Sequence, residues 1–186
     1  TQSRSSAASD VYKRQQMHAG QTRKYTGEPY INHPAEVATI VANVGGSYDM
    51  IAAAWLHDVV EDCGVALETI HAMFGLEVRE LVYWLTDESR PQDGNRATRK
   101  EIDRRHIAMA PADAQTIKLA DLISNTSSIV ERDPGFAKVY LAEKERLLRV
   151  MVKGDPQLWR KAMLTLLAGK EAITPPLPES ADSGRG

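Results

Sequence analysis

The stretch AWLHDVVED, residues 54–62, places one imidazole and three carboxylates at the end of a strongly apolar segment. In a continuous helix, side chains four positions apart are neighbours, which pairs His57 with Glu61. The same spacing pairs Asp58 with Asp62. Burying carboxylates without partners is costly, so the cluster needs a cation, a hydrogen-bond network or water. A divalent metal ion meets all of these needs.

A metal site requires more ligands than this stretch supplies. The other candidates are the remaining histidines and the acid of the segment KLADLISN: His18, His33, His71, His106 and Asp121. Asp121 lies among apolar residues, where a buried carboxylate requires a cation or strong hydrogen-bond donors. The spacing permits, without requiring, a shared site made of His33, His57, Asp58 and Asp121. A helix-end ion pair between His57 and Asp58 is the simpler alternative.

Four separated motifs carry a family resemblance: HAGQTRK, GEPYINHP, LHDVVED and IKLADLISN. In this order they resemble the HD-domain hydrolases of the RelA/SpoT type, and in particular their small, stand-alone alarmone-hydrolase members. The resemblance runs from about Met17 to about Asn125, with weaker agreement to about position 169. A lone His-Asp dipeptide would indicate almost nothing, whereas four motifs in the right order are specific.

The resemblance implies a manganese ion held by His33, His57, Asp58 and Asp121. It also implies that Glu61 and Asp62 act on the reaction. Mixed imidazole and carboxylate ligands suit manganese, and a bound divalent ion lowers the pKa of water. The acidic pair is placed to orient that water and take its proton. The implied reaction removes the 3′ pyrophosphate from guanosine that carries a 5′ diphosphate or triphosphate, and leaves GDP or GTP.

The same resemblance implies a set of nucleotide contacts: Arg23, Lys24, Lys118, Asn125 and Tyr140. The first two precede the His33 loop, and Asn125 matches a residue that bonds the ribose. Arg96, Arg99 and Lys100 open a basic helix that could meet the distal phosphates. Surface charge is the simpler reading of these basic residues. Ser127 stands where family members often carry arginine, which leaves the exact nucleotide open.

Helices joined by short loops must position these groups. Period-2 alternation is scarce and aromatic residues make up 6% of the chain, so we predict an all-α fold: a single HD-domain helical bundle of about eight helices. One helix is expected from Pro34 toward Gly45, and another, capped by Asp49, should continue through Ala54 to Cys63. Further helices are expected over 67–74, 76–86, 95–110, 112–130, 136–152 and 156–169, with a loop over 88–94.

The ends of the chain differ from its middle. SSAASDVYKRQ resembles translated adapter sequence, so we predict that residues 1–15 are non-native or disordered; a natural polar extension is the alternative. Residues 16–170 are the expected HD phosphohydrolase domain. Residues 171–186, rich in Pro, Ser and Gly, are an expected disordered tail.

Composition limits the partners. The net charge is −2, from 23 basic and 25 acidic residues, which gives no overall attraction to nucleic acid or anionic membranes. Cys63 is the only cysteine, so an intramolecular disulfide is excluded and a cytoplasmic location is expected. We therefore predict a small-molecule nucleotide substrate, with neither nucleic acid nor membrane as partner. The oligomeric state stays open.

Two other functions stay open. One is an HD-domain phosphohydrolase of another nucleotide, such as a dinucleotide 2′-phosphate. The other is a catalytically idle, nucleotide-binding regulator. The intact His57-Asp58 and Glu61-Asp62 pairs argue against a catalytically idle domain, because such domains usually lose their activity by losing the metal-binding pair.

Overall fold

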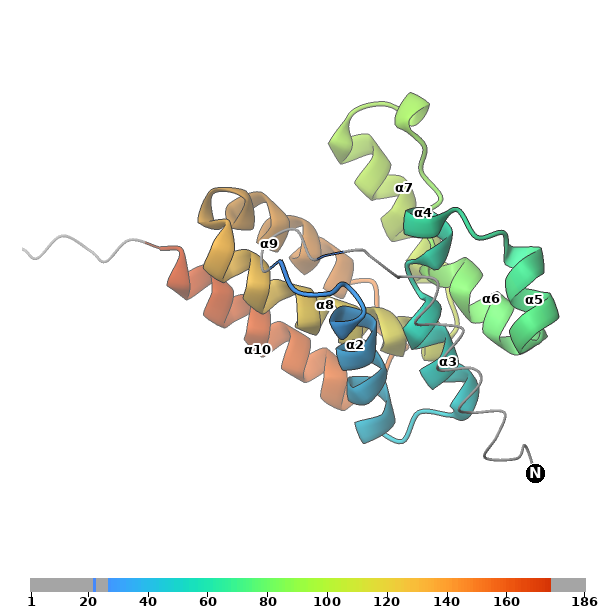
Figure 1. Cartoon of the computed structure of the whole chain (residues 1–186). Coiled ribbons are helices and arrows are strands. Elements are labelled where there is room, and N and C mark those ends of the chain that lie inside the picture. The colour runs from blue at the N-terminus through green and yellow to red at the C-terminus, as the bar shows by residue number, and fades with distance from the viewer. Residues whose placement is uncertain (1–21, 23–26, 175–186) are drawn as a thin grey trace, which may run out of the picture.

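The structure is a computed structural model that describes Thr22 and residues 27–174. Within these residues every regular element is a helix, which confirms the predicted all-α fold (Figure 1). The elements are α2 (Asn32–Asn43), α3 (Tyr48–Leu56), α4 (Val59–Cys63), α5 (Leu67–Phe74), α6 (Leu76–Leu85), the 3₁₀ turn η1 (Pro91–Asp93), α7 (Arg96–Met109), α8 (Ala112–Arg132), α9 (Pro134–Leu148) and α10 (Pro156–Ala172). None of the described helices has both the length and the apolar character needed to cross a membrane.

The long helix α8 is the centre of the bundle. It contacts α2, α3, α6, α7, α9 and α10, and Figure 1 shows α10 running alongside it. Apolar side chains are buried around most of its circumference, including Ile117, Leu119 and Leu122, as expected of a helix enclosed on several sides. Polar residues on α8 are therefore drawn into the interior, and Asp121 is only 5% exposed.

The predicted helix from Asp49 to Cys63 is wrong in two respects. Its cap is Ser47, whose Oγ accepts a hydrogen bond from the Met50 N–H at 3.2 Å, so Asp49 lies in the first turn. The helix also divides: α3 ends at Leu56, and Asp58 precedes α4 with φ −104° and ψ −3°. The break separates His57 from α4, whereas Asp58 and Asp62 keep their four-residue spacing, since the Asp62 N–H donates to the Asp58 carbonyl at 2.8 Å.

The side chain of His57 gives a physical reason for this break. Its Nδ1 atom lies 2.8 Å from the Ala54 carbonyl oxygen. A continuous α-helix would offer that oxygen to the N–H of Asp58, four residues later. The imidazole therefore competes with the backbone for this acceptor, as short polar side chains do where helices end.

The later helices follow the prediction more closely. The apolar face of α6 is buried at Val78, Leu81, Val82 and Leu85. Helix α9 begins at Pro134, earlier than predicted, because the Asp133 side chain accepts from the Phe136 N–H and caps it. Helix α10 continues to Ala172. Residues 1–15 and 175–186 lie outside the described residues, so the domain boundaries stay predictions.

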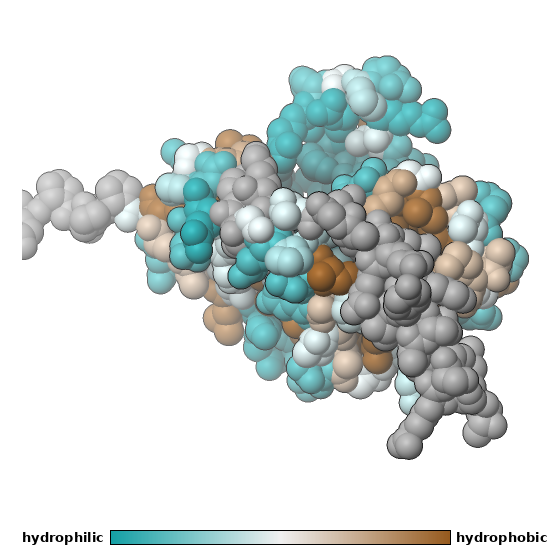
Figure 2. Space-filling view, viewed as in Figure 1, coloured by the Kyte–Doolittle hydropathy of each residue, from teal (hydrophilic) through white to brown (hydrophobic). Residues whose placement is uncertain are grey.

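Helix α7 stands out from the rest of the bundle in Figure 1. Figure 2 shows its protruding end and the preceding loop as almost wholly hydrophilic. Asn95 caps this helix by accepting from the Thr98 N–H at 3.0 Å. Residues of α7 and α9 both line a pocket that adjoins the site described next.

Candidate metal centre and adjoining pocket

Four predicted residues from separate elements meet in the interior. His33 is in the first turn of α2, His57 and Asp58 fill the break between α3 and α4, and Asp121 lies on α8. Asp58 Oδ2 is 3.0 Å from His57 Nε2 and 3.9 Å from His33 Nε2. Asp121 Oδ1 is 3.3 Å from His33 Nε2 and 3.7 Å from His57 Nε2. Both imidazoles are almost fully buried.

The two Nε2 atoms have no hydrogen-bond partner among the described residues, although both are buried. The opposite ring nitrogens are engaged: His57 Nδ1 by the Ala54 carbonyl at 2.8 Å, and His33 Nδ1 by Ser124 Oγ at 3.0 Å. A carbonyl only accepts, so Nδ1 of His57 carries a proton, and loss of the second proton gives a ring whose Nε2 lone pair is directed toward the carboxylates. Buried polar atoms rarely lack partners, which marks this point as a ligand site.

The geometry fits a divalent ion. Donor atoms that share an ion at about 2.1 Å are at most about 4.2 Å apart, and all four imidazole–carboxylate distances are shorter than that. Donor atoms of His33, His57 and Asp58 all lie within 4.8 Å of one another. The donor set of two imidazoles and two carboxylates suits a borderline divalent metal.

Electrostatics keep both carboxylates ionised. Burial works against the charge on Asp121, but Lys118 and the two imidazoles outweigh it and hold the Asp121 pKa well below its usual value. The pKa of Asp58 is also lowered, because His57 outweighs the effect of burial. Conversely, Asp58 and Asp121 raise the pKa of His57 to about 10 despite its burial. The cluster of His33, His57, Asp58 and Asp121 is thus a strong cation site, which a proton or a metal ion can occupy.

Three further side chains support the carboxylates. Asn125 Nδ2 donates to Asp121 Oδ1 at 2.6 Å, and Lys118 Nζ is 3.3 Å from Asp121 Oδ2. The polar ends of Asn125 and Lys118, assigned to the nucleotide from the sequence, therefore contact Asp121. The Tyr30 hydroxyl donates to Asp58 Oδ2. Sequence reasoning missed Tyr30, although it lies within the quoted GEPYINHP motif.

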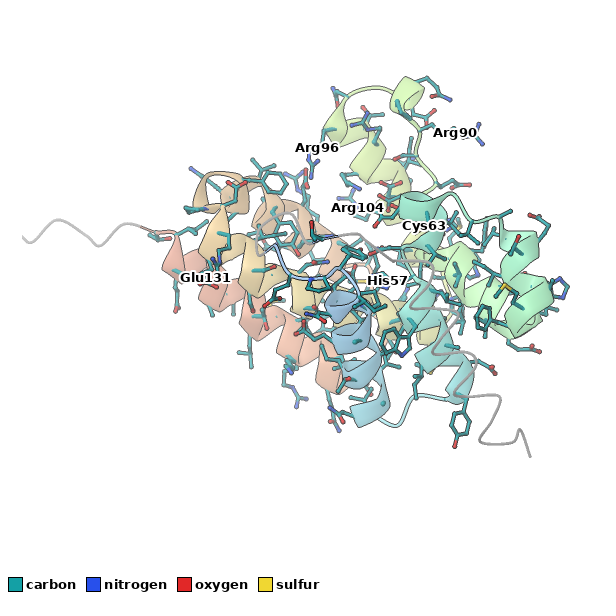
Figure 3. All side chains as sticks on the ribbon, in the orientation of Figure 1. His57, Cys63, Arg90, Arg96, Arg104 and Glu131 are labelled. Carbon is teal, nitrogen blue, oxygen red and sulfur yellow. The ribbon has the colours of Figure 1, made fainter. Side chains whose placement is uncertain are left out.

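A pocket of about 570 Å³ adjoins this centre, between α7, α8, α9 and the end of α6. Lys118 and Tyr140 line it as expected of substrate contacts, and Glu61 lines it from α4. Figure 3 shows Arg96 and Arg104 on the side of α7 that faces α9, whereas Arg90 points away. The volume is within the range of about 300–1,000 Å³ typical of small-molecule sites.

Most of the basic side chains in the pocket already have acidic partners. Arg96 binds Glu143 through two hydrogen bonds of 2.8 Å, and Lys100 Nζ lies 2.6 Å from Asp87. Within the described part of the chain, Lys144 lines the pocket without an ion pair. Burial and then the nearby Lys118 lower the pKa of Lys144. Arg146 also lines the pocket without an ion pair in the described residues, so these two cations are free to meet an anion.

Glu61 and Asp62, the two acids predicted to act on the reaction, differ in whether they line the pocket. Glu61 Oε1 accepts from the Asp87 N–H at 2.7 Å, and the pKa of Glu61 is raised by its withdrawal from water and by Asp87. Both residues are exposed on the same short helix, but Asp62 is not among the described residues that line the pocket. The structure thus favours Glu61 over Asp62 as the group nearest a bound ligand.

The remaining candidates fall elsewhere. Arg23, Lys24 and His18 lie outside the described residues, so the roles predicted for Arg23 and Lys24 stay predictions. His71 is exposed on α5. His106 is buried away from the proposed metal ligands, stacks on Trp84 with ring centroids 4.8 Å apart, and lines the pocket with it.

Comparison with known proteins agrees with this architecture. The HD-domain family model matches residues 11–146. A probable guanosine-3′,5′-bis(diphosphate) 3′-pyrophosphohydrolase of Synechocystis is 40% identical over 63% of this chain, which spans only 16% of that protein. The guanosine-3′,5′-bis(diphosphate) 3′-pyrophosphohydrolase MESH1 of Xenopus tropicalis is 34% identical over 68% of this chain and 70% of its own length.

A solved structure supports the fold. It is described as a metazoan ortholog of SpoT that hydrolyses ppGpp, and it matches with a TM-score of 0.80 over 90% of this chain and 97% of its own, at 24% identity. That likeness establishes the helical architecture alone. Since the family model spans most of the chain and the Xenopus relative is matched over more than two thirds of its length, the chain belongs to the HD-domain family.

Proposed function

We propose that the protein is a metal-dependent 3′-pyrophosphohydrolase of guanosine 3′,5′-bis(diphosphate) and its 5′-triphosphate analogue. The observation that carries this proposal is the pair of buried, unpartnered Nε2 atoms of His33 and His57, which face Asp58 and Asp121 beside a pocket lined by six basic and five acidic side chains. The names of the Synechocystis and Xenopus relatives support the choice of substrate.

We assign the metal to His33, His57, Asp58 and Asp121, and we propose manganese because mixed nitrogen and oxygen donors suit it. A bound divalent ion acidifies a water molecule and stabilises charge on a phosphoryl oxygen. Two other side chains orient the proposed carboxylate ligands by hydrogen bonds: Tyr30 donates to Asp58, and Asn125 donates to Asp121. Lys118 stays cationic, because Asp121 and Asp87 outweigh its burial and raise its pKa.

Glu61 is the proposed proton acceptor. Its raised pKa strengthens the tendency of the carboxylate to take up a proton, as a general base requires. In the proposed step, water attacks the phosphorus attached to the ribose 3′ oxygen, Glu61 takes a proton from that water, and the bond to the 3′ oxygen breaks. Pyrophosphate leaves as one unit, and the 3′ oxygen takes up a proton. Asp62, exposed beside Glu61, has a supporting role in this proposal.

The pocket accounts for the rest of the substrate. Arg96, Lys100, Lys118 and Lys144 are the basic groups proposed to meet its phosphates. Tyr140 is 5% exposed and its hydroxyl lies 3.4 Å from Thr126 Oγ1, so its ring forms a fixed part of the wall. We also propose a cytoplasmic location and a role in the stringent response; the single cysteine supports the first, and the role in starvation responses described for the metazoan ortholog of SpoT supports the second.

A product assay tests the proposal. Purified protein with Mn²⁺ is incubated with guanosine tetraphosphate, and the products are separated by ion-exchange chromatography. We expect GDP and pyrophosphate in equal amounts. Orthophosphate as the first product would contradict the proposal and favour a general nucleotide phosphatase. Tight binding without any product would favour the idle regulator, and turnover of a dinucleotide 2′-phosphate alone would favour the other hydrolase.

A further inference from the structure

A chain of hydrogen bonds runs from the proposed metal centre to the surface of the bundle. His33 Nδ1 lies 3.0 Å from Ser124 Oγ, and Ser124 Oγ lies 2.6 Å from Glu36 Oε2. Ser124 is on α8, one turn after Asp121, and is 5% exposed. Glu36 is on α2, one turn after His33, and is exposed. The same two helices thus supply both the ligands and the groups behind them.

The chemistry of these groups fixes the direction of both bonds. An ionised carboxylate only accepts hydrogen bonds, so the hydroxyl proton of Ser124 is donated to Glu36. A hydroxyl has one proton to donate, so its oxygen must accept from His33 Nδ1–H. With the proton on Nδ1, the neutral ring of His33 has its lone pair on Nε2. That atom faces Asp121 at 3.3 Å and has no hydrogen-bond partner in the described chain.

We propose that Ser124 and Glu36 are positioning residues that lock His33 into the tautomer and orientation in which its Nε2 atom binds the metal. Neither group touches the ion or the substrate. This inference depends on the metal site of the proposed function, but not on which nucleotide is hydrolysed. Hydrogen-bond partners behind a ligating histidine typically change metal affinity about 10- to 100-fold.

The two histidines differ in how they are held. His57 is fixed by a backbone carbonyl of its own helix, at 2.8 Å from Ala54 oxygen. His33 is fixed by a side chain 91 positions away, reached only through tertiary packing of α2 on α8. The hydrogen bond that fixes His33 can therefore be removed by substituting Ser124. It also makes the metal affinity of the site depend on the packing of α2 against α8.

The test measures binding of Mn²⁺ alone to the full chain by isothermal titration calorimetry. Ser124→Ala removes the acceptor, and we expect Mn²⁺ affinity to fall about 10- to 100-fold. Ser124→Thr keeps a hydroxyl and should restore much of the loss. Ser128→Ala is the matched control: it removes a hydroxyl one turn later on α8 that bonds only to the Asn125 carbonyl of its own helix in the described structure. It should leave affinity unchanged.

Melting temperatures separate positioning from general destabilisation. The metal-free melting temperature of Ser124→Ala should stay close to that of the parent, while the increase produced by saturating Mn²⁺ should shrink. Glu36→Ala provides a second test at an exposed position where folding is not at risk. It frees the Ser124 hydroxyl to donate to His33 Nδ1, which favours the wrong tautomer, and should also weaken Mn²⁺ binding.

The outcomes are distinguishable. Unchanged Mn²⁺ affinity in both Ser124→Ala and Glu36→Ala would overturn the positioning role and leave the proposed function intact. A parent protein that binds no Mn²⁺ would instead overturn the metal site on which both proposals depend. Equal losses in Ser124→Ala and Ser128→Ala would reduce Ser124 to a packing residue of α8.

Discussion

The Asp121 carboxylate lies 3.3 Å from the His33 imidazole, although the two residues belong to different helices, α8 and α2. Both side chains are buried, at 5% and 2% exposure. A buried carboxylate beside an imidazole nitrogen without a partner is costly unless a cation joins them. The packing of α2 on α8 therefore builds half of the proposed metal centre, and the break between α3 and α4 supplies the other half.

Asp58→Ala should abolish most metal binding. The substitution removes one of four proposed ligands and leaves the Tyr30 hydroxyl without the carboxylate that it donates to. Some loss of stability should accompany it, because unpaired polar groups remain. Metal content per chain, measured by plasma mass spectrometry after gel filtration, checks this. Asp113→Ala, which removes an exposed carboxylate at the start of α8, should keep full occupancy; full occupancy in Asp58→Ala would refute this ligand set.

Glu61→Gln should keep the metal and lose turnover. The amide can still accept from the Asp87 N–H, so the local structure should hold, but it cannot take a proton from water. We expect kcat to fall on the order of 10²-fold or more. Steady-state kinetics and metal analysis of the same sample check both halves of this expectation. Glu68→Gln, at an exposed position on α5, is the control, and a near-normal kcat in Glu61→Gln would make that residue an ordinary solvated charge.

The sequence predicted most of the helices well, because apolar periodicity is a local signal. The spacing only permitted His33, His57, Asp58 and Asp121 to meet, and the family resemblance implied that they share a metal ion. The sequence did not predict the break at His57, since the competition between an imidazole and a backbone N–H for the Ala54 carbonyl depends on side-chain conformation. Nor did it indicate Ser124, whose hydroxyl matters only because α8 packs against α2. Polar residues in a helix have too many ordinary roles for sequence to single one out.

Charge was also hard to interpret from sequence. The basic start of α7 suggested phosphate contacts, yet Arg96 and Lys100 are paired with acids from other elements. Lys144, which drew no attention in the sequence, lines the pocket without an ion pair in the described residues, as does Arg146. Ion pairing depends on which helices become neighbours, so it follows from the fold rather than from local pattern. Arg23 and Lys24 lie outside the described residues, so their contacts to the nucleotide stay predictions from sequence.

Gly154→Ala should destabilise the protein. A Cβ atom at this position would lie 2.7 Å from Leu119 Cδ1 and 3.2 Å from backbone atoms of α8. On either side of Gly154, the Lys153 N–H donates a hydrogen bond to Gln115 Oε1 and the Asp155 N–H donates one to Thr116 Oγ1. These two bonds hold the segment against α8. Overpacking of this kind costs about 1–3 kcal/mol of unfolding free energy.

Urea unfolding at fixed metal concentration measures this effect. Gly135→Ala is the matched control, since its Cβ would meet nothing closer than 3.8 Å at the start of α9, and it should be neutral or slightly stabilising. Equal urea midpoints for Gly154→Ala and Gly135→Ala would contradict this prediction. They would show that α8 and the segment after α9 can move apart to accommodate the added methyl group.

Lys144→Met should impair substrate capture more than chemistry. Lys144 lines the pocket from α9, its ammonium lies 5.3 Å from the centre of the Tyr140 ring, and within the described chain it has no carboxylate partner. A phosphate of the substrate would relieve its lowered pKa, whose main cause is burial. Loss of one charge-assisted hydrogen bond costs about 1.5–3 kcal/mol, or roughly 10- to 150-fold.

That loss should appear mainly as a higher KM with kcat little changed, the signature of binding energy shared by ground state and transition state. Steady-state kinetics on guanosine tetraphosphate check it, with Lys161→Met on the exposed side of α10 as the control. Because Lys144 contacts none of the proposed metal ligands in the described structure, Mn²⁺ affinity should stay at the parent value. A fall in kcat alone would instead place Lys144 at the reacting phosphate, and unchanged kinetics would leave Arg96 and Lys100 to bind the phosphates after breaking their own ion pairs.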